Sequence, residues 1–532
     1  MDHFYYPYPS RRQVVFANKG MVATSQLLAA QAGLHALRAG GNAVDAAVAA
    51  AACLTVVEPT SNGIGGDAFA LVWAKGRLHG LNASGPSPFG LTYDMLKGKG
   101  LAQMPDSGWL PVTVPGAPAA WSALHERFGK LSFAALFEPA IEYAQNGYPV
   151  SPVVSRLWKS ALERFKQYSG DEFLPWFSTF APTGQAPTPG ETVRLPGHAA
   201  SLKAIAQSRA QDFYRGELAE KIIDFAQKTG GYLRLRDLAE FAPEWVDPIG
   251  INYRGYEVWE IPPNGHGLVT LLALNILKGF DFDAKESVDT YHRQMEAIKL
   301  AFADGLKYIG DPRFMQVSVP ELLAGGYAAE RRKLIGNEAL APATGTFGGG
   351  GTVYLATADG EGNMVSYIQS NYKGFGSGLV VPGTGIALQD RGANFSLVHS
   401  DANCFAPGKK PYHTIIPGFL TKNNQPVGPF GVMGAFMQPQ GHLQVVVNTA
   451  DFLLNPQAAL DAPRWQWISG KTIQVEPQFP DHIAQALARR GHDIVRTVDG
   501  QAMGRGQIIW RDAGGTLMGA TEPRADGAVC AW

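Results

Sequence analysis

The chain has 532 residues, with 45 Lys plus Arg against 46 Asp plus Glu, so its formal net charge is -1. This balance argues against a nucleic-acid-binding protein, because such proteins normally carry a strongly basic surface. Charged residues make up 17% of the chain and hydrophobic residues 45%. That composition excludes a disordered chain and indicates a globular protein with a large buried core.

Cysteine usage and the N-terminal segment bear on the compartment. Cys53, Cys404 and Cys530 lie far apart and form no CxxC motif, which argues against a zinc ribbon. A sparse, odd number of cysteines favours a reducing compartment. The first residues lack the apolar run of a secretory signal, and the longest apolar stretch, 46–57, is too short to span a bilayer. We therefore expect a cytoplasmic protein without a membrane partner.

The N-terminal part of the chain predicts two helices followed by a glycine loop. Thr24 or Ser25 is expected to cap a helix that ends at the glycine pair 40–41, and an alanine-rich helix should follow from Asn42 or Asp45 to about Val57. The glycine-rich sequence after residue 58 then leads into a short apolar strand. Two more helices are expected within 116–147, with a break near a glycine.

The middle of the chain alternates between irregular and helical patterns. Residues 148–200 are rich in Pro, Gly and aromatic residues, which predicts a long ordered excursion on the surface. Helical periodicity follows in four segments: 199–208, 216–229, 286–309 and 320–336. By contrast, 337–351 has small residues, four terminal glycines and no periodicity.

After Gly351 the apolar period changes to two. A strand over 352–358, a turn at 359–363 and a returning strand over 364–370 predict a hairpin. Further strands are expected at 379–381, 415–420 and 427–432, and helices at 440–452 and 455–461. Strands and helices intermix throughout, so the pattern predicts a layered α/β or α+β fold.

The junction between Gly351 and Thr352 allows two interpretations. Four glycines before a strand can be a flexible linker. They also permit the backbone angles of a strained scissile bond, followed directly by a hydroxyl residue able to attack the preceding carbonyl. Cleavage would leave Thr352 with a free α-amine, which can act as the base for its own hydroxyl.

Six motifs relate most of the chain to a known family. They occur as GGNAVDAAVA at 40–49, EPTSNGIGGDAF at 58–69, VPGAPAAW at 114–121, AFADGLKYIGDPRF at 301–314, APRW at 462–465 and GATEPRADG at 519–527. With these motifs the sequence resembles the γ-glutamyltransferase family of N-terminal-nucleophile hydrolases. The resemblance implies an α+β fold in a four-layer αββα sandwich. It also implies self-cleavage into a large chain, 1–351, and a small chain, 352–532, which form a heterodimer and leave open a dimer of heterodimers.

The same resemblance assigns the catalytic positions. Thr352 matches the family nucleophile, with Gly351–Thr352 as the cleavage site, and Ser370 matches a second hydroxyl residue that assists it. The family then has an asparagine near the amine of the nucleophile; here either Asn371 or Tyr372 could take that position.

Two further residues match the family's oxyanion hole. Gly434 and Ala435 stand where the family has a glycine pair whose backbone N–H groups form that hole. Alanine in the second position keeps the N–H but narrows the allowed backbone angles.

The substrate-binding positions depart from the family. Ser84 stands where the family has an arginine for the glutamate carboxylate, and Asn394 where it has an acid for the amino group. Two serines are replaced by His413 and Thr414, and Arg391 stands in place of a neutral amide. The departures imply a small pocket for a carboxylate, formed by Arg391 with His413 and Thr414.

The expected activity is therefore amide hydrolysis of a small carboxylate-bearing substrate. Oxamate fits this description, and the chain resembles the family's oxamate amidohydrolase branch, which serves purine-nitrogen catabolism. A γ-glutamyltransferase or glutathione hydrolase with a rebuilt anchor is the alternative, with a longer acyl chain, as in cephalosporin acylases, as a variant. An uncleaved binding protein is the third hypothesis. We expect no cofactor and no metal, and we expect Arg313 and Arg464 to form ion pairs in the core.

Overall fold

The computed structural model describes residues 12–342 and 351–532. Its centre consists of two seven-stranded sheets. The first contains, in spatial order, β1 (Val15–Ala17), β18 (Leu517–Thr521), β17 (Arg505–Arg511), β13 (Gln425–Met433), β12 (Gly418–Lys422), β9 (Tyr256–Glu260) and β8 (Ile249–Tyr253). Residues from both ends of the chain thus meet in one sheet.

The second sheet places the predicted hairpin at its centre. Its order is β19 (Ala528–Ala531), β2 (Gly20–Thr24), β10 (Gly351–Asp359), β11 (Met364–Tyr372), β3 (Asp67–Ala74), β4 (Arg77–Ala83) and β7 (Glu244–Val246). The hairpin prediction is confirmed, with Leu355 opposite Tyr367. A β-bulge lies between Gly351 and Val353, so the ladder is irregular at the predicted cleavage site.

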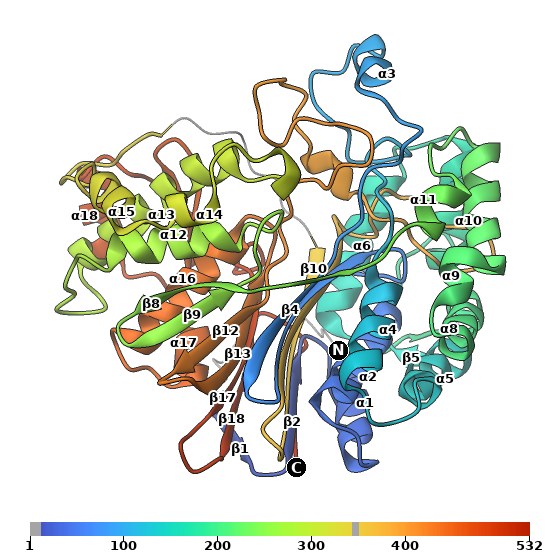
Figure 1. Cartoon of the computed structure of the whole chain (residues 1–532), viewed down its shortest axis with the longest axis horizontal. Coiled ribbons are helices and arrows are strands. Elements are labelled where there is room, and N and C mark those ends of the chain that lie inside the picture. Colours follow the sequence, from blue (N-terminus) through green and yellow to red (C-terminus); the bar gives the residue numbers. More distant parts are fainter. Residues whose placement is uncertain (1–11, 343–350) are drawn as a thin grey trace.

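Helices cover the outer faces of both sheets, in two groups on opposite sides of the strands (Figure 1). The helices packed on the second sheet are α1 (Leu27–Arg38), α2 (Ala43–Val57), α4 (Ala117–Phe128), α5 (Glu138–Asn146), α6 (Pro152–Phe165), α7 (Leu174–Phe180), α8 (Pro196–Ser208) and α10 (Glu217–Lys228). Those on the first are α12 (Gly267–Leu277), α13 (Val288–Tyr308), α16 (Met437–Ala450), α17 (Pro456–Asp461) and α18 (Asp481–Arg489). A third apolar cluster, which includes Phe69, Tyr354 and Phe419, joins the facing sides of the sheets.

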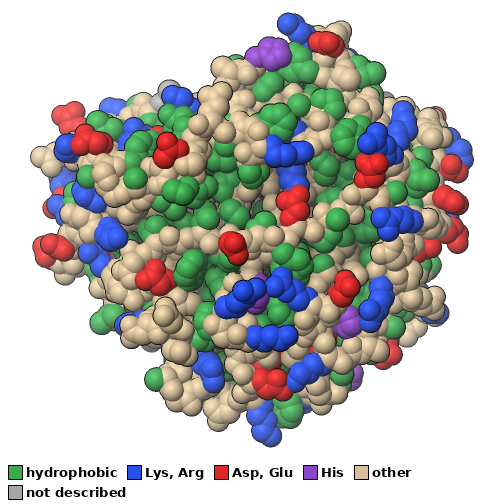
Figure 2. Space-filling model, viewed as in Figure 1, with side chains coloured by type: hydrophobic (Ala, Val, Ile, Leu, Met, Phe, Trp, Pro, Cys, Tyr) green, Lys and Arg blue, Asp and Glu red, His purple; other side chains and the backbone are tan. Residues whose placement is uncertain are grey.

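Shorter elements complete the fold. They are α3 (Tyr93–Gly98), α9 (Gln211–Arg215), α11 (Leu235–Ala239), α14 (Val319–Leu322) and α15 (Gly325–Arg332), a small sheet of β14 (Trp465–Ser469), β15 (Thr472–Val475) and β16 (Asp493–Arg496), and the pair β5 (Tyr148–Pro149) and β6 (Thr192–Val193). Among the described residues, no helix has the length and apolar character needed to cross a membrane. On the face in Figure 2, basic and acidic side chains are interspersed.

The predicted mixture of helices and strands is confirmed, but the start of the first helix was misassigned. Gln26, not Thr24 or Ser25, caps α1, and its side chain accepts from the N–H groups of Leu28 and Ala29. Thr24 instead belongs to β2, where it lies opposite Leu355 of β10, and its hydroxyl donates to the carbonyl of Tyr354 in that strand. The second helix does begin at Asn42, with a capping box.

Three other sequence expectations need correction. Residues 148–200 are not a surface excursion, because α6 and α7 bury Trp158 and Trp176 in the core. The helix α12 escaped notice, since it is buried on every side and its uniformly apolar sequence has no period. The strand at 379–381 is reduced to a bridge between Val380 and Ala387. Most of the irregular segment 337–351, at 343–350, lies outside the described residues.

Candidate active site

Thr352 and Ser370 meet at the peptide bond that joins Gly351 to Thr352. Thr352 is only 1% exposed, and its Oγ1 donates to Ser370 Oγ at 3.1 Å. Ser370 Oγ donates in turn to the carbonyl oxygen of Gly351 at 2.8 Å, and it accepts from the N–H of Tyr372 at 2.7 Å. The predicted nucleophile and its assisting hydroxyl are therefore brought together at the predicted scissile carbonyl.

This arrangement has a direct chemical consequence. A donor that points at a carbonyl oxygen stabilises the negative charge that develops there when a nucleophile attacks the carbon. Ser370 is such a donor for Gly351, while Thr352 supplies a hydroxyl on the other side of the same peptide bond. The bulge in β10 takes the strand out of regular pairing at this point.

Asn371 and Tyr372, the alternative partners for the amine of Thr352, point elsewhere. The side chain of Asn371 faces the glycine loop, where a Cβ on Gly63 would lie 2.8 Å from its Nδ2 and a Cβ on Gly66 2.7 Å from its Oδ1. Its side-chain atoms have no hydrogen-bond partner within the described part of the chain. Tyr372 has a positive φ of 73°, and the Arg391 guanidinium lies 4.7 Å from its ring centre. In the intact chain neither side chain contacts the amide of Thr352 through a recorded hydrogen bond.

Arg391, His413 and Thr414 do cluster, but around an acid that sequence reasoning missed. Arg391 Nε and Nη2 lie 3.3 and 3.4 Å from the two carboxylate oxygens of Asp67, and Nη1 donates to Thr414 Oγ1 at 2.7 Å. His413 Nε2 lies 2.5 Å from Asp67 Oδ2. The expected anion pocket is thus occupied by a carboxylate of the chain itself. Asp67 follows the glycine loop directly, and an acid in that motif was the available signal.

The charges of this cluster follow from burial and pairing. Burial opposes ionisation of Asp67, but Arg391 and His413 outweigh it and lower the pKa of the carboxyl. Burial, with the nearby Arg391 charge, lowers the pKa of His413 to about 4. His413 is therefore neutral near pH 7, and Asp67 is the counter-ion of Arg391.

Ser84 and Asn394 supply no charge to the site. Ser84 is buried, and its Oγ donates to Asn82 Oδ1 at 2.7 Å beside the side chain of Asn264. Asn394 lies in the 3₁₀ turn that begins at Arg391, and its carbonyl accepts from Asn403 at 2.6 Å. Neither position can hold the charged groups of a glutamate in the way the family does.

Gly434 and Ala435 form the turn between β13 and α16. Their φ angles are 141° and 51°, so Ala435 adopts the left-handed conformation that glycine would tolerate better. Their carbonyls accept from the first turn of α16, at Met437 and Gln438. The turn therefore leads into a helix N-terminus, where backbone N–H groups lack intrahelical partners and the field favours an anion.

A cavity of 630 Å³ begins at Gly351 and borders this turn at Gly434. Its wall combines apolar side chains with three cations and one acid. These are Leu157, Met433, Phe436 and Trp467 for the apolar part, and Arg164, Lys373, Arg505 and Asp106 for the charged part. The cations come from three separate segments and belong to no motif, so sequence reasoning missed them.

Two of these cations are held by Asp106. Lys373 Nζ lies 2.5 Å from Asp106 Oδ2, and Arg164 Nη2 donates to the carbonyl oxygen of the same residue at 2.8 Å. Asp390, buried behind them, lies 3.9 Å from Arg164, and burial raises the pKa of its carboxyl to about 6. The cavity thus carries a positive balance at its wall.

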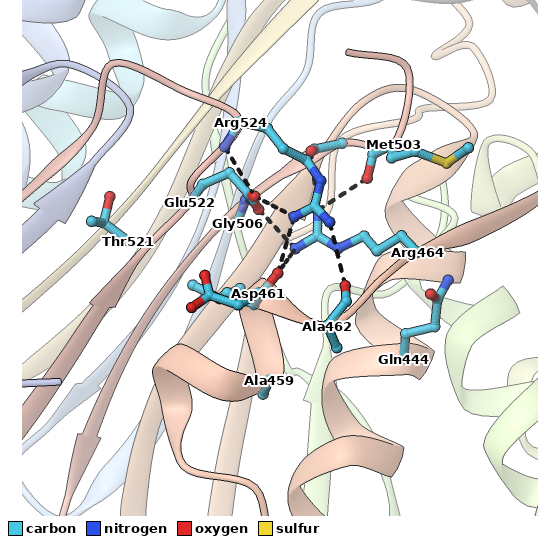
Figure 3. Close-up of polar contacts among 12 residues, drawn as sticks. Gln444, Ala459, Asp461, Ala462, Arg464, Met503, Gly506, Thr521, Glu522 and Arg524 are labelled. Carbon is cyan, nitrogen blue, oxygen red and sulfur yellow. Dashed lines mark hydrogen bonds and ion pairs between the residues drawn. The ribbon is translucent and has the colours of Figure 1, made fainter. Parts of the chain in front are cut away.

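The two arginines expected in core ion pairs behave differently. Arg464 is buried and pairs with Glu522 at 2.7 Å, as predicted, within the network of Figure 3. Arg313 does pair with Asp311 at 2.6 Å, but its side chain is 63% exposed, so it is not in the core. At the surface, Nη2 of Arg313 also donates to the carbonyl of Gly408, at 2.8 Å.

One buried cluster has the residue types of a metal site. It consists of His292 and Glu296 on α13 and of His492, which precedes β16, and their ligand atoms lie within 4.8 Å of one another. His292 bonds His492 at 2.8 Å and the carbonyl of Gly336 at 3.0 Å, and Lys299 Nζ reaches His492 Nδ1 at 3.4 Å. Every ring nitrogen thus has a partner, and the Lys299 ammonium, 2.8 Å from Glu296, already supplies a cation. The cluster fits a hydrogen-bonded network without an ion.

Comparison with known proteins places this site in a family. The model of γ-glutamyltranspeptidase matches residues 29–532. A glutathione hydrolase-like proenzyme, YwrD, of Bacillus subtilis is 38% identical over 97% of this chain and 99% of its own. An oxamate amidohydrolase proenzyme of Klebsiella pneumoniae is 34% identical over 96% and 98%.

A solved structure is more similar still. The crystal structure of a cephalosporin acylase from Bacillus halodurans is 64% identical, with a TM-score of 0.97 over 100% of this chain and 99% of that one. The matched family model and these relatives show that the chain belongs to the γ-glutamyltranspeptidase family of N-terminal-nucleophile amide hydrolases.

Proposed function

We propose that the chain is a self-cleaving amide hydrolase whose nucleophile is Thr352. The observation that carries the proposal is the hydrogen-bonded series from Thr352 Oγ1 through Ser370 Oγ to the carbonyl oxygen of Gly351. In self-cleavage, Thr352 Oγ1 attacks the Gly351 carbonyl carbon and its proton passes to the Thr352 nitrogen, so that the C–N bond breaks, an ester forms and the α-amine is freed. Water then hydrolyses the ester, which restores the Thr352 hydroxyl and leaves a carboxylate on Gly351.

The mature site would use the same parts on a substrate amide. The α-amine, with an ordinary pKa of about 8, takes the proton from Thr352 Oγ1 and passes it to the leaving amine. The N–H groups of Gly434 and Ala435 are our candidates for stabilising the oxyanion, because their turn borders the cavity and leads into a helix N-terminus. Water then releases the acid from the threonine ester.

The architecture supports a two-chain product that stays associated. After cleavage, β10 and β11 of the small chain remain hydrogen-bonded between β2 and β3 of the large chain. Both chains therefore share one sheet, and their separation would expose its centre. We infer that the three core clusters are the interfaces of a four-layer αββα sandwich and that the product is a heterodimer.

For the substrate, we propose an N-acyl amide whose acyl chain ends in a carboxylate. The charge of Arg391 is already matched by Asp67, whereas the wall of the cavity at Gly351 carries three cations, one acid and apolar side chains. Its volume of 630 Å³ exceeds what oxamate needs and suits a chain of several methylenes. The similarity to a cephalosporin acylase supports an acyl amide as the class of substrate.

Oxamate is the second candidate, and one contact favours it. Arg391 donates to the hydroxyl of Thr414 at 2.7 Å, so a small carboxylate could still be recognised by this pair if Asp67 yielded. A γ-glutamyl substrate is less well supported, because Ser84 and Asn394 replace the charged residues that would hold its carboxylate and amino group.

The test separates maturation from substrate choice. Wild type and Thr352→Ala are analysed by denaturing mass spectrometry, and wild type should yield a fragment beginning at Thr352 while the variant stays intact. Thr357→Ala is the matched control, because its buried hydroxyl lies on the same strand and donates to the carbonyl of Ala43, away from Gly351. Cleavage in Thr352→Ala would overturn the mechanism.

Substrates are then compared on the matured protein. Release of 4-nitroaniline from N-glutaryl-4-nitroanilide is followed beside ammonia release from oxamate and from L-glutamine. Turnover of the glutaryl amide alone supports the acylase proposal. Turnover of oxamate alone replaces it by the second candidate, and turnover of glutamine by the γ-glutamyl alternative.

A further inference from the structure

Arg505, the first residue of β17, is a buried cation whose hydrogen-bonding groups are largely unused. It is 6% exposed and lies in the wall of the cavity that begins at Gly351. Its Nε has no partner among the described residues. Its Nη1 lies 3.8 Å from Oε1 of Glu58, and its Nη2 donates to Oε1 of Gln501 at a long 3.4 Å. A guanidinium has five N–H donors, and burying it without partners is unfavourable.

Glu58 is a poor counter-ion for this arginine. Ser25 Oγ donates to Glu58 Oε2 at 2.5 Å, and the other carboxylate oxygen, Oε1, lies 3.8 Å from Nη1 of Arg505, which is beyond hydrogen-bond distance. Burial raises the pKa of Glu58 despite the opposing influence of Arg505. Glu58 therefore leaves the donors of the Arg505 guanidinium without a close carboxylate acceptor.

A second buried arginine shows what full pairing looks like in the same region. Arg464 donates to Glu522 at 2.7 Å and to the carbonyls of Met503 and Gly504, both at 3.0 Å (Figure 3). These partners meet most of the needs of its guanidinium within the protein. The contrast indicates that the free donors of Arg505 are a specific feature of its position.

The Arg464–Glu522 pair also fixes the backbone on both sides of Arg505. Arg464 holds the carbonyls of the two preceding residues, and Glu522 Oε2 accepts the N–H of Gly506, which follows Arg505, at 2.7 Å. In Figure 3 these groups converge from separate segments on one point. Arg505 is thus held on a rigid support, as a binding residue requires.

The position of Arg505 relates it to the reaction centre. The preceding residue, Gly504, packs on the turn at Gly434, where a Cβ would lie 3.1 Å from the Gly504 Cα. On the other side, Glu58 belongs to the loop whose Thr60 carbonyl and Ser61 Cα lie 3.1 Å from a Cβ built on Gly351. Arg505 thus follows a residue that packs on the turn before α16, its guanidinium is near the loop that contacts Gly351, and all three line one cavity.

We propose that Arg505 is the anchor for the terminal carboxylate of the acyl chain. This inference rests on the proposed function and names the residue that gives it specificity. A carboxylate can accept two parallel hydrogen bonds from a guanidinium, and the missing partner of Arg505 is an anion of this kind. The apolar side chains of Leu157, Met433 and Phe436 would accompany the methylenes.

The experiment compares a charged substrate with a neutral one of the same length. N-glutaryl-4-nitroanilide and N-pentanoyl-4-nitroanilide are assayed with matured wild type and with Arg505→Gln, Arg505→Lys and Arg156→Gln. Arg505→Gln should raise KM for the glutaryl amide about 10- to 100-fold, because a charge-assisted pair is lost. KM for the pentanoyl amide should stay within about twofold, and Arg505→Lys should fall between.

The controls distinguish the possible failures. Arg156→Gln removes an arginine from α6 whose side chain is 40% exposed. It should change KM for neither amide. An equal loss for both amides, or no loss for the glutaryl amide, overturns the anchor while the hydrolase stands. Wild type that turns over neither amide, although cleaved before Thr352, overturns the proposed acyl substrate on which the anchor rests.

A second measurement does not depend on the maturation of the variant. Free glutarate should inhibit pentanoyl-amide hydrolysis by wild type competitively, whereas glutaramide at the same concentration should not. If both inhibit equally, the cavity does not recognise a carboxylate and the inference is wrong. If Arg505→Gln does not mature, the inhibition constant of glutarate is measured with Arg505→Lys instead. An inhibition constant equal to that of wild type also overturns the anchor.

Discussion

The most direct perturbation of the site is Ser370→Ala. It removes the hydroxyl that donates to the Gly351 carbonyl at 2.8 Å, accepts from Thr352 at 3.1 Å and accepts from the N–H of Tyr372 at 2.7 Å. Loss of one donor to a developing oxyanion costs about 3–4 kcal/mol of transition-state stabilisation. Self-cleavage should therefore slow by about 10²- to 10³-fold, because 1.36 kcal/mol corresponds to a factor of about ten.

The assay follows the intact precursor by denaturing mass spectrometry after synthesis is stopped. Ser366→Ala is the matched control, because Ser366 lies on the same strand and its buried hydroxyl bonds the hydroxyl of Tyr354, at 2.7 Å, away from Gly351. It should cleave at the wild-type rate. Cleavage of Ser370→Ala at that rate would refute the reasoning, since the hydroxyl would then contribute nothing to the attack on Gly351.

Three other outcomes are expected. Ala435→Val should destabilise the protein by more than about 2 kcal/mol in denaturant unfolding, because Ala435 has φ of 51° and a β-branched residue tolerates that region poorly, whereas Ala435→Gly should stay within about 1 kcal/mol. Burial lowers the pKa of His413 from 6.5 to about 4, so between these pH values the unfolded chain binds more protons. The free energy of unfolding should therefore fall by up to about 3 kcal/mol as pH drops through this window, and an unchanged slope in His413→Gln would contradict the assignment. Glu522→Gln should lose about 3–5 kcal/mol by leaving Arg464 buried without its counter-ion, and Glu522→Gln with Arg464→Met should lose less; equal losses would argue against a coupled pair.

Local patterns in the sequence were enough to predict much of the fold. The hairpin of β10 and β11 follows from a two-residue apolar period on either side of a turn, and α2 follows from its cap at Asn42. Such features depend on neighbours within a few residues. The helix α12 could not be recognised in this way, because burial on all sides removes the period that marks an amphipathic helix.

The residues of the candidate site also differ in whether their sequence neighbours reveal their role. Thr352 could be proposed as the nucleophile because it stands directly after a permissive glycine run and matches the family's position, and both are relations within the sequence. Arg391 could be identified as an unusual cation, but its partner Asp67 is 324 residues away, so its electrostatic state could not. A charge separated from its partner in the sequence has no local signature.

The sequence by itself therefore predicted the position of the proposed nucleophile, the central hairpin and the family. Only the tertiary structure decided which cations are available to a substrate. It pairs Arg391 with Asp67 and Arg464 with Glu522, and it leaves Arg505 in a cavity wall with its donors largely unused. The physical reason is that the strength of a charge in a protein depends on burial and on the distance to its counter-ion, and both arise only when distant segments pack together.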